Sequence, residues 1–275
     1  MRPSRFVGIR LFRPAYKRPQ PLSRTFFDRD PRQVGRDLLG KVLVRREKKY
    51  FLAARIVEVE AYLGGEDAAA HAFAGRTARN AVLFGPPGFA YVYFIYGNHY
   101  CLNVSCLPDG IPGGILFRAL EPLAGIDRMA ALRAISLPRG SYSARDLRQL
   151  ATGPGRLAEA FGITRDRDNG KDLTDPDSGL FLADDGHPAP QVRITPRIGI
   201  TKAADLPLRY IVADSLFVSG PRTLRGTAPS TSKKLQGNTI LSMSRVLPTK
   251  AATATSAGRS TRATGSRVSG STISK

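Results

Sequence analysis

Both ends of the chain lack acidic residues, and this restricts the part of the chain that can fold. Residues 1–24 contain seven Lys and Arg, residues 223–275 contain nine, and neither stretch contains Asp or Glu. With 16 of its 42 basic residues in these flanks, the chain keeps 26 bases and all 22 acids in the middle, 25–222. The middle therefore has the balanced composition of a globular domain, between two basic flanks.

The two flanks are predicted to be disordered. The C-terminal one, from about Thr223, consists of Ser, Thr, Gly, Ala and scattered bases, which cannot bury much apolar surface. The N-terminal one is rich in Arg and Pro; it resembles a transit peptide in lacking acids, but a translation start placed too far upstream explains it equally well. Basic tails draw a chain toward polyanions, usually nucleic acid, and a solubilising tail is an equally good interpretation.

Composition excludes several classes of protein. Hydrophobic residues make up 42% of the chain, which is enough for a sizeable core and excludes a wholly disordered protein. Two cysteines are too few for a secreted disulfide framework and fit a reducing compartment. The sequence contains no apolar run of about 18 residues, so no transmembrane helix is predicted.

The middle of the chain shows helix and strand patterns in mixed order. Asp30 can cap a helix that has Pro31 at its first position and ends at Gly40. Several strands then follow one another, with helices before and after them, and this order favours an α+β fold. Strands are predicted at 41–46, 51–62, 89–95, 100–105, 114–120, 192–200 and 208–218, and further helices at 126–135, 144–150 and 156–161.

Two acidic side chains, Glu58 and Glu60, lie on the longest predicted strand. Strand alternation puts both on one face with Tyr62, while the apolar residues between them share the other face. An acid on a mostly apolar strand costs free energy unless it is paired or used. One interpretation is a salt-bridged acid with Arg55 or Arg118 as its partner, and the other is a carboxylate tuned to activate water.

The few His and Cys residues predict no metal site. The chain has three His and two Cys, and neither an HxxxH nor a CxxC spacing occurs. Cys101 and Cys106 are five residues apart on a strand-like segment, so their side chains point to opposite faces and are interpreted as core thiols. His71, in the long loop 63–88, indicates by itself a structural role more readily than a catalytic one.

Tyrosines are concentrated on the predicted hairpin 89–105. Tyr91 and Tyr93 share a strand face, which is typical of a core. Tyr96 lies at the hairpin tip beside Gly97, where a side chain can project, and in a basic protein it could stack on or between nucleic-acid bases. The segment 153–156 (Gly-Pro-Gly-Arg) is interpreted as a turn, or as a helix start whose N–H groups could meet a phosphate.

Short motifs run in order through the middle of the chain, from about residue 24 to 221. They are EVEAYLG at 58–64, ED at 66–67, His71, RN at 79–80, YVYFIYG at 91–97, CLNVS at 101–105, LFRALEP at 116–122, GPGRL at 153–157, RIGI at 197–200 and PLRY at 207–210. No single motif is sufficient, but the ordered set is highly specific. The set resembles the alkyladenine (3-methyladenine) DNA glycosylase family, and both flanks lie outside the resemblance.

The resemblance implies a single α+β domain at 25–222, built around a curved antiparallel sheet flanked by helices, that acts as a monomer without metal or other cofactor. Its implied partner is double-stranded DNA containing damaged purines, not a membrane. The implied reaction of base excision repair flips a purine of the 3-methyladenine, 7-methylguanine, hypoxanthine and ethenoadenine class out of the duplex and hydrolyses its N-glycosidic bond. An abasic site remains, and without an indicated catalytic Lys no strand cleavage is expected. In a bacterium the protein would be cytoplasmic and nucleoid-associated, unless the basic N-terminus targets it.

The resemblance also implies the catalytic groups. By position, Glu60 matches the family's general base, and Arg118 and the backbone carbonyl of Ile198 match the groups that help to hold the attacking water. The local pattern agrees, because two residues of strand separate Glu60 from Tyr62 by roughly 6.5–7 Å, a suitable offset between a stacked base and its sugar carbon. A nearby Arg118 would keep Glu60 ionised.

The lesion pocket is implied in the same way. Tyr62, His71 and Tyr93 match the walls of the base pocket, and flat aromatic faces attract electron-poor alkylated purines. Asn103 matches the residue that disfavours guanine, and Tyr96 matches the side chain that takes the place of the extruded nucleotide.

Two segments depart from the family pattern, 73–79 beside the pocket and 214–217 near the end of the resemblance. They bear on lesion preference more than on the reaction. The alternatives are a non-catalytic lesion-binding protein of the same fold and a basic structural nucleoid protein. The second explains the flanks but not the central motifs, and an intact Glu60 and Arg118 favour the enzyme.

Overall fold

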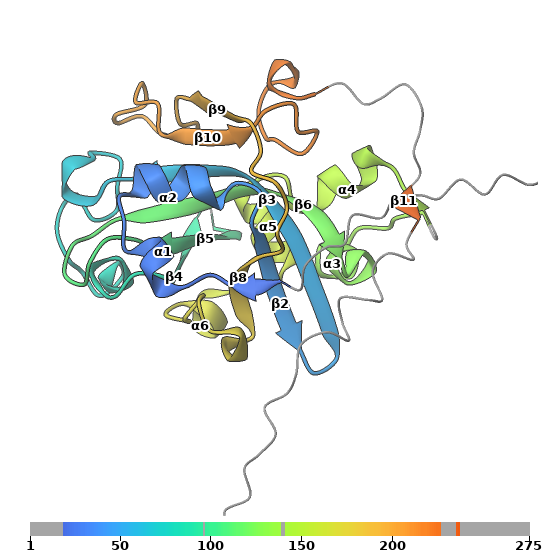
Figure 1. Cartoon of the computed structure of the whole chain (residues 1–275), viewed down its shortest axis with the longest axis horizontal. Helices are drawn as coiled ribbons and strands as arrows, with labels where there is room; N and C mark the ends of the chain where they lie inside the picture. The colour runs from blue at the N-terminus through green and yellow to red at the C-terminus, as the bar shows by residue number, and fades with distance from the viewer. Residues whose placement is uncertain (1–18, 96, 139–140, 227–234, 237–275) are drawn as a thin grey trace, which may run out of the picture.

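An antiparallel sheet carries the fold, and helices pack against it (Figure 1). The computed structural model describes residues 19–95, 97–138, 141–226 and 235–236. The main sheet has the strand order β1-β8-β2-β3-β6-β5-β4, with β10 attached to β3 and β9 attached to β10. Its strands are β1 (Gln20–Pro21), β2 (Val42–Glu47), β3 (Tyr50–Tyr62), β4 (Ala90–Ile95), β5 (His99–Ser105), β6 (Gly114–Ala124), β8 (Leu180–Asp184), β9 (Val192–Thr195) and β10 (Arg209–Val212).

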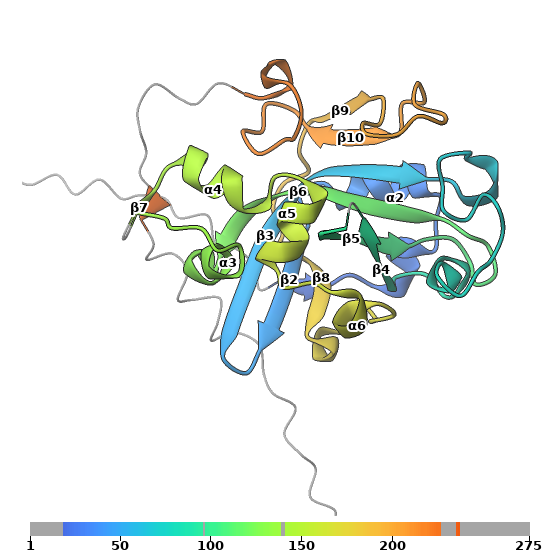
Figure 2. The same ribbon diagram turned by 180° about the vertical axis from the view of Figure 1, so that it is seen from behind.

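Helices lie in front of and behind the sheet. The first view shows α2 in front of the sheet, and the reverse view shows α3, α4 and α5 there (Figures 1 and 2). The curved antiparallel sheet with flanking helices confirms the α+β prediction. The helices are α1 (Arg24–Phe27), α2 (Pro31–Leu38), α3 (Ile126–Leu132), α4 (Ala144–Ala151), α5 (Pro154–Ala160) and α6 (Arg165–Asp168), with 3₁₀ turns at Gly64–Glu66, Ala81–Phe84, Pro176–Ser178 and Arg222–Leu224. The short strands β7 (Ser141–Tyr142) and β11 (Leu235–Gln236) form a second, two-stranded sheet.

The pairing of the long strand β3 is irregular at Glu58. On one edge it pairs with β2 and then with β10, and on the other edge it pairs with β6. The pairing with β6 shifts on both sides of Glu58, which leaves Val57 on β3 and Arg118 on β6 without a direct partner across this pair. Such bulges bend a strand and increase its twist. A bulge of the β3–β6 pair therefore lies where Glu58 and Arg118 meet.

The two faces of β3 differ in polarity, as the alternation predicts. Val59 lies opposite Phe117 and Ala61 lies opposite Ile115, and all four are fully buried in the core. Directly paired residues share a face. On this face α2 comes close to the sheet, since a Cβ at Gly35 would lie 3.5 Å from the Ile115 side chain. The other face carries Glu58, Glu60 and Tyr62 toward the cavity described below.

Local sequence signals explain the helix ends. The Asp30 carboxylate accepts a hydrogen bond from the backbone N–H of Arg32, with Pro31 in the first turn of α2. Gly40, two residues after the helix, has φ 86°. At α4 the predicted Ser143 cap is confirmed, because Ser143 and Asp146 form a capping box.

Several predicted boundaries are wrong. The strand predicted at 192–200 ends at Thr195, before Pro196, which has no N–H to donate to a ladder. The strand predicted at 208–218 ends at Val212, and the chain turns at Asp214, where φ is 59°. The sequence patterns also omit β8, although it is fully paired between β1 and β2.

The flanks predicted to be disordered are residues 1–24 and 223–275, and 1–18, 227–234 and 237–275 lie outside the described residues. Residues 223–226 still contact the domain: Arg225 donates from Nε to the carbonyl of Val218 at 3.3 Å. Within the described ranges, no helix combines the length and the apolar character that crossing a bilayer requires.

Candidate active site

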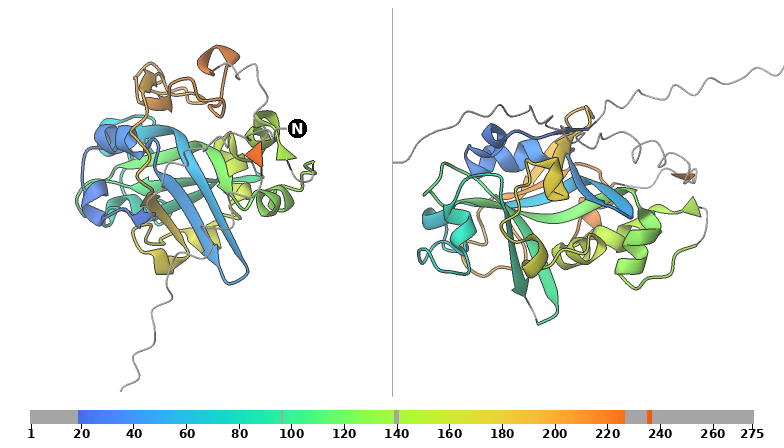
Figure 3. Two further views of the ribbon diagram at one scale, coloured as in Figure 1. Left: turned by 45° about the vertical axis from the view of Figure 1, so that its right-hand side comes forward. Right: turned by 90° about the horizontal axis from the view of Figure 1, so that it is seen from below.

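A cavity of about 400 Å³ opens beside the polar face of β3. It is bounded by β3, the β4–β5 hairpin, β6, the first residues of α5 and the segment 198–200. The right-hand view of Figure 3 shows the hairpin projecting from the body of the molecule. The volume lies in the range of pockets that enclose small ligands. Residues from distant parts of the chain meet here because the curled sheet brings them together.

Aromatic rings form one wall of the cavity. The His71 ring packs edge-on against Tyr93, with ring centroids 4.5 Å apart, and its Nδ1 is 2.9 Å from the Tyr91 hydroxyl. Desolvation of the ring, together with the positive charge of Arg79, lowers the pKa of His71, which favours its neutral form at neutral pH. Arg79 also lies over the Tyr93 ring, 5.8 Å from its centroid. This wall can stack against a flat ligand.

The ring of Tyr62 is held by a buried ion pair. The guanidinium of Arg197 lies over this ring at 4.6 Å and binds Asp67 with both terminal nitrogens, at 2.5 and 2.8 Å. Burial would lower the pKa of Arg197, but Asp67 outweighs this and raises it, so the pair stays charged. Burial, followed by the negative charge of Glu60, raises the pKa of Tyr62, so its hydroxyl remains a donor. The orientation of Tyr62 is therefore well supported.

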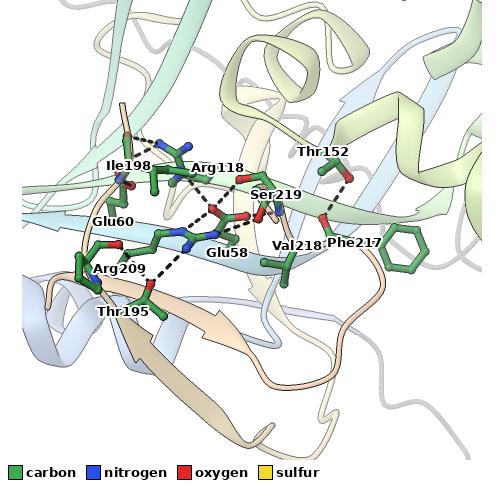
Figure 4. A network of polar contacts seen from close by, with 12 residues as sticks. Glu58, Glu60, Arg118, Thr152, Thr195, Ile198, Arg209, Phe217, Val218 and Ser219 are labelled. Atoms are coloured by element: carbon green, nitrogen blue, oxygen red, sulfur yellow. Dashed lines mark hydrogen bonds and ion pairs between the residues drawn. The ribbon is translucent and has the colours of Figure 1, made fainter. Parts of the chain in front are cut away.

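The carboxylate of Glu60 is fully buried behind the cavity wall. Its Oε1 accepts a hydrogen bond from the backbone N–H of Ile198 at 3.0 Å (Figure 4). Its Oε2 accepts a hydrogen bond from the Tyr62 hydroxyl at 3.0 Å and lies 3.2 Å from Nη1 of Arg118. Tyr62, Arg118 and Ile198 all line the cavity, so each group that binds Glu60 also faces the ligand space.

Arg118 connects the two acids of β3. Its Nε donates to Glu58 at 3.0 Å, and its Nη1 approaches both Glu60 and the carbonyl of Ile198, the latter at 3.4 Å. Burial would lower the pKa of Arg118, but Glu60 and Glu58 outweigh this and raise it. Arg118 is therefore a fixed cation at the edge of the cavity, beside a backbone carbonyl.

Glu58 is also fully buried and has a different set of partners. Besides Arg118, it accepts from Nε of Arg209 at 2.8 Å, and from Oγ and the backbone N–H of Ser219 at 2.8 and 2.6 Å (Figure 4). Burial would raise the pKa of Glu58, but Arg209 and Arg118 outweigh it and hold the pKa below its ordinary value. Arg118 was a correct prediction for its partner. Arg55 was wrong, because it binds Asp185 instead, directly after β8.

Asn103 and Cys101 lie on β5 at the floor of the cavity. Asn103 is buried and donates from Nδ2 to the backbone carbonyl of Tyr91 at 3.1 Å, which fixes the amide in place. Burial raises the pKa of Cys101, so it is a neutral thiol. Cys101 and Cys106 are both free and buried, as expected of core thiols.

The structure brings together the predicted groups that it describes. The two sets are Glu60, Arg118 and Ile198 in mutual contact, and Tyr62, His71, Tyr93 and Asn103 around the cavity. Tyr96 lies outside the described residues. Four further residues support the site and were not predicted, because no local pattern marks them as partners: Asp67, Arg197, Arg209 and Ser219. In the part of the chain that the structure describes, no cluster of three or more His, Cys, Asp or Glu could hold a metal ion.

Comparison with known proteins places the chain in a family. Residues 25–216 match the family described as methylpurine-DNA glycosylase. A protein of Koribacter versatilis, provisionally named a 3-methyladenine DNA glycosylase, is 70% identical over 204 residues, which cover 74% of this chain and 95% of the relative. Relatives with the same provisional name from Burkholderia lata and Methanoculleus marisnigri are each 48% identical, over 74% and 72% of this chain and 93% and 98% of their own lengths. The chain belongs to the methylpurine-DNA glycosylase family.

Proposed function

We propose that this protein hydrolyses the N-glycosidic bond of a damaged purine flipped out of duplex DNA, with Glu60 as the general base. The observation that carries the proposal is the contact of Glu60 with Tyr62, Arg118 and Ile198, each of which also lines the cavity. A flat base stacked on Tyr62 in this cavity would bring its sugar close to the carboxylate. Family membership makes DNA the substrate, and the protein acts on it as a monomer.

The cavity suits an alkylated purine. A base inside a duplex cannot reach any enzyme group, so the nucleotide must first leave the stack. Tyr62 on one side and the ring wall of His71 and Tyr93 on the other offer flat surfaces for it. Purines such as 3-methyladenine carry a positive charge, which aromatic faces attract. The neutral form of His71, favoured by its lowered pKa, adds no repulsion to such a base.

Water activation requires one contact of Glu60 to open. Both carboxylate oxygens have partners in the structure, Oε1 with Ile198 and Oε2 with Tyr62 and Arg118. Catalytic hydrogen bonds are often rearranged when the substrate binds. A base stacked on Tyr62 would draw its hydroxyl from Oε2, and a water held by Arg118 and the Ile198 carbonyl would replace it. Glu60 then takes one proton of this water as the water oxygen bonds to C1′ and the N-glycosidic bond breaks. The electron pair of that bond leaves with the base, so a positively charged purine departs neutral and hypoxanthine departs as an anion that takes a proton from solvent. An abasic site remains.

A single-turnover assay with excess enzyme tests the proposal. The substrate is a duplex with one hypoxanthine, and the product is the free base together with an alkali-labile abasic site. Release from this duplex, with no release from the undamaged control duplex, is the expected result. Tight lesion binding without release would identify a lesion-binding protein instead, and equal binding of both duplexes would indicate a structural DNA-binding protein.

Replacing Asn103 by Ser should relax the exclusion of guanine bases. The fixed amide stands at the cavity floor, and we propose that it meets the 2-amino group that guanine has and hypoxanthine lacks. The rate of 7-methylguanine release, divided by the rate of hypoxanthine release, should rise about tenfold in N103S. An unchanged ratio in single-turnover assays would assign the exclusion to another part of the pocket.

Deleting residues 237–275 should weaken DNA binding without changing the rate at which bound DNA releases its damaged base. This segment carries six Lys and Arg and no acid. Each neutralised phosphate adds about 0.9 to the slope of log K against log salt, so truncation should flatten this slope by a few units at most. Lesion preference should not change, since phosphate contacts carry no base information. A lower single-turnover rate at saturating enzyme would show instead that this segment belongs to the catalytic domain.

A further inference from the structure

We propose that Glu58 is a positioning residue of the same reaction: together with Arg209 and Ser219 it holds the Nε edge of Arg118, so that Arg118 meets Glu60 through a single nitrogen. This inference rests on the proposed function and adds a residue that does not touch the substrate. Glu58 is absent from the cavity lining. It acts only through Arg118.

The first support is the number of donors that Glu58 binds. The carboxylate is completely buried and accepts four hydrogen bonds, from Nε of Arg118, Nε of Arg209, and both Oγ and N–H of Ser219. Burying an ionised carboxylate is costly unless it is fully paired. One arginine would be enough to neutralise the charge of Glu58. The carboxylate instead binds two arginines and a serine, which come from three separate parts of the chain. The number of contacts indicates that the position of the carboxylate matters.

The second support is the way in which Arg118 divides its donors. A guanidinium and a carboxylate prefer to pair through two parallel hydrogen bonds. No such pair of parallel hydrogen bonds joins Arg118 to Glu60: its Nε is bound to Glu58, and its Nη1 lies 3.2 Å from Glu60. The same nitrogen remains 3.4 Å from the carbonyl of Ile198. If Glu58 released Nε, Arg118 could turn its fork to Glu60 and occupy the oxygen that must receive the proton of the water.

The third support is the charge balance around Glu60. Two cations and two carboxylates alternate in the network, in the order Arg209, Glu58, Arg118, Glu60. The other charged or titratable groups that face Glu60 are Tyr62 on its own strand, Cys101 on β5 and Arg197 before the segment 198–200. Without the negative charge of Glu58, the same cations would act on Glu60 alone. The electrostatic potential at the Glu60 carboxylate would then be more positive.

The fourth support is the anchoring of Ser219. Its carbonyl accepts from Nη2 of Arg209 at 3.0 Å, and two residues earlier the carbonyl of Phe217 accepts from the Thr152 hydroxyl at 3.0 Å (Figure 4). The segment around Ser219 is thereby tied both to β10 and to the end of α4. It lies beyond residue 216, where the family match ends. The chain supplies this support from a segment that the family match does not cover.

The variant E58Q tests the inference through the pH dependence of single-turnover release of hypoxanthine. Gln keeps the shape of Glu58 and removes its charge. We expect the plateau rate to fall about 10–100-fold, as for a displaced catalytic group. Because the potential at the reacting carboxylate becomes more positive, the acidic limb of the profile should move to lower pH. A purely structural defect would lower the rate without moving the limb toward acid. E58D, which keeps the charge, should restore the limb and recover part of the rate.

The matched control is D185N. Asp185 is buried like Glu58 and also pairs with an arginine of β3, Arg55, through hydrogen bonds of 2.8 and 3.1 Å, but it lies outside the cavity. D185N should lower the melting temperature and leave the profile unchanged. If E58Q does not fold, S219A and S219T replace it: the Ala variant should lose about tenfold in rate and the Thr variant, which keeps the hydroxyl, should not.

The outcomes separate the inference from the proposed function. A wild-type rate and profile for E58Q, or a rate loss in E58Q no larger than that in D185N, overturns the positioning role while the proposed function stands. Absence of base release by the wild-type protein overturns the proposed function itself. Full activity of S219A, in the case where E58Q does not fold, overturns the positioning role as well.

Discussion

Glutamine in place of Glu60 is expected to lower the rate of base release by about 10²–10⁴-fold, the usual contribution of a general base. The amide fills the same buried space and can still accept from Ile198 or from Tyr62, so the shape of the cavity is kept. It cannot take a proton from water. Binding of a hypoxanthine duplex should therefore remain close to that of the wild-type protein. Single-turnover rates and equilibrium binding of the two proteins provide the comparison.

The control for this variant is E121Q rather than E58Q. Glu58 shares a face with Glu60, which at first suggests a neutral comparison, but its carboxylate binds Arg118 and is unsuitable. Glu121 is a half-buried strand acid on β6, paired across the ladder with Arg55 and outside the cavity. Its Gln variant should keep the wild-type rate within about twofold, as a substitution outside the reacting groups. If E60Q releases the base at a rate similar to that of E121Q, Glu60 is not the general base.

Methionine in place of Arg118 is expected to have the largest effect on stability. The substitution leaves Glu60 without its cation and Glu58 with one arginine in place of two. Removing one partner of a buried ion pair costs about 3–5 kcal/mol. Because Arg209 remains on Glu58, we expect a loss at the lower end, about 3 kcal/mol in urea unfolding at pH 7. Base release should be lost as well, since the water loses one of its ligands.

This stability loss should depend on pH. In the wild-type protein burial tends to raise the pKa of Glu58, but Arg209 and Arg118 outweigh it and hold the pKa below its ordinary value of 4.5. The ionised group therefore stabilises the fold above pH 4.5, and this contribution is lost as the pH falls through the folded-state pKa. In R118M, ionised Glu58 stabilises the fold less, because it has lost one of its two arginines. The difference in unfolding free energy between the two proteins should be largest at neutral pH and shrink below about pH 4.5.

A second arginine of the sheet provides the comparison. Arg55 on β3 makes a buried, two-nitrogen pair with Asp185 away from the cavity. R55M should lower the free energy of unfolding to a similar extent. It should leave the single-turnover rate of base release unchanged. If R118M unfolds at the same urea concentration as the wild-type protein, the network around Glu58 does not contribute to the stability of the fold.

One part of the site, the polar face of β3, can be predicted from local periodicity alone. Alternation along one strand is sufficient to put Glu58, Glu60 and Tyr62 on a common face, and the structure confirms it through their shared contacts with Arg118 and with each other. The hairpin of β4 and β5 and the capped starts of α2 and α4 also follow from short-range patterns. These features depend only on residues that are close to one another in sequence.

The remaining features depend on which strands become neighbours. Arg55 and Arg209 are equally plausible partners for Glu58 by residue type, but β10 lies beside β3 at Glu58, whereas Arg55 faces β8 through Asp185. The pair of Asp67 and Arg197 joins two loops 130 residues apart. The strand β8, a short apolar run, has no periodicity that distinguishes it from other buried segments. Such pairings are set by the register of the sheet as a whole.

The contact between Glu58 and Ser219 also determines when, during folding, the protein becomes competent. The two residues are 161 positions apart, whereas β2 and β3, or β4 and β5, are joined by short turns. Contacts between residues close in sequence form early, and closing so long a loop costs more entropy, so the hairpins precede the Ser219 contact. A nascent chain that ends before residue 219 has the strands of the pocket but lacks two of the four donors that hold Glu58. If Glu58 positions Arg118 as proposed, such a chain should release damaged bases more slowly than the complete domain, and full activity should require residue 219.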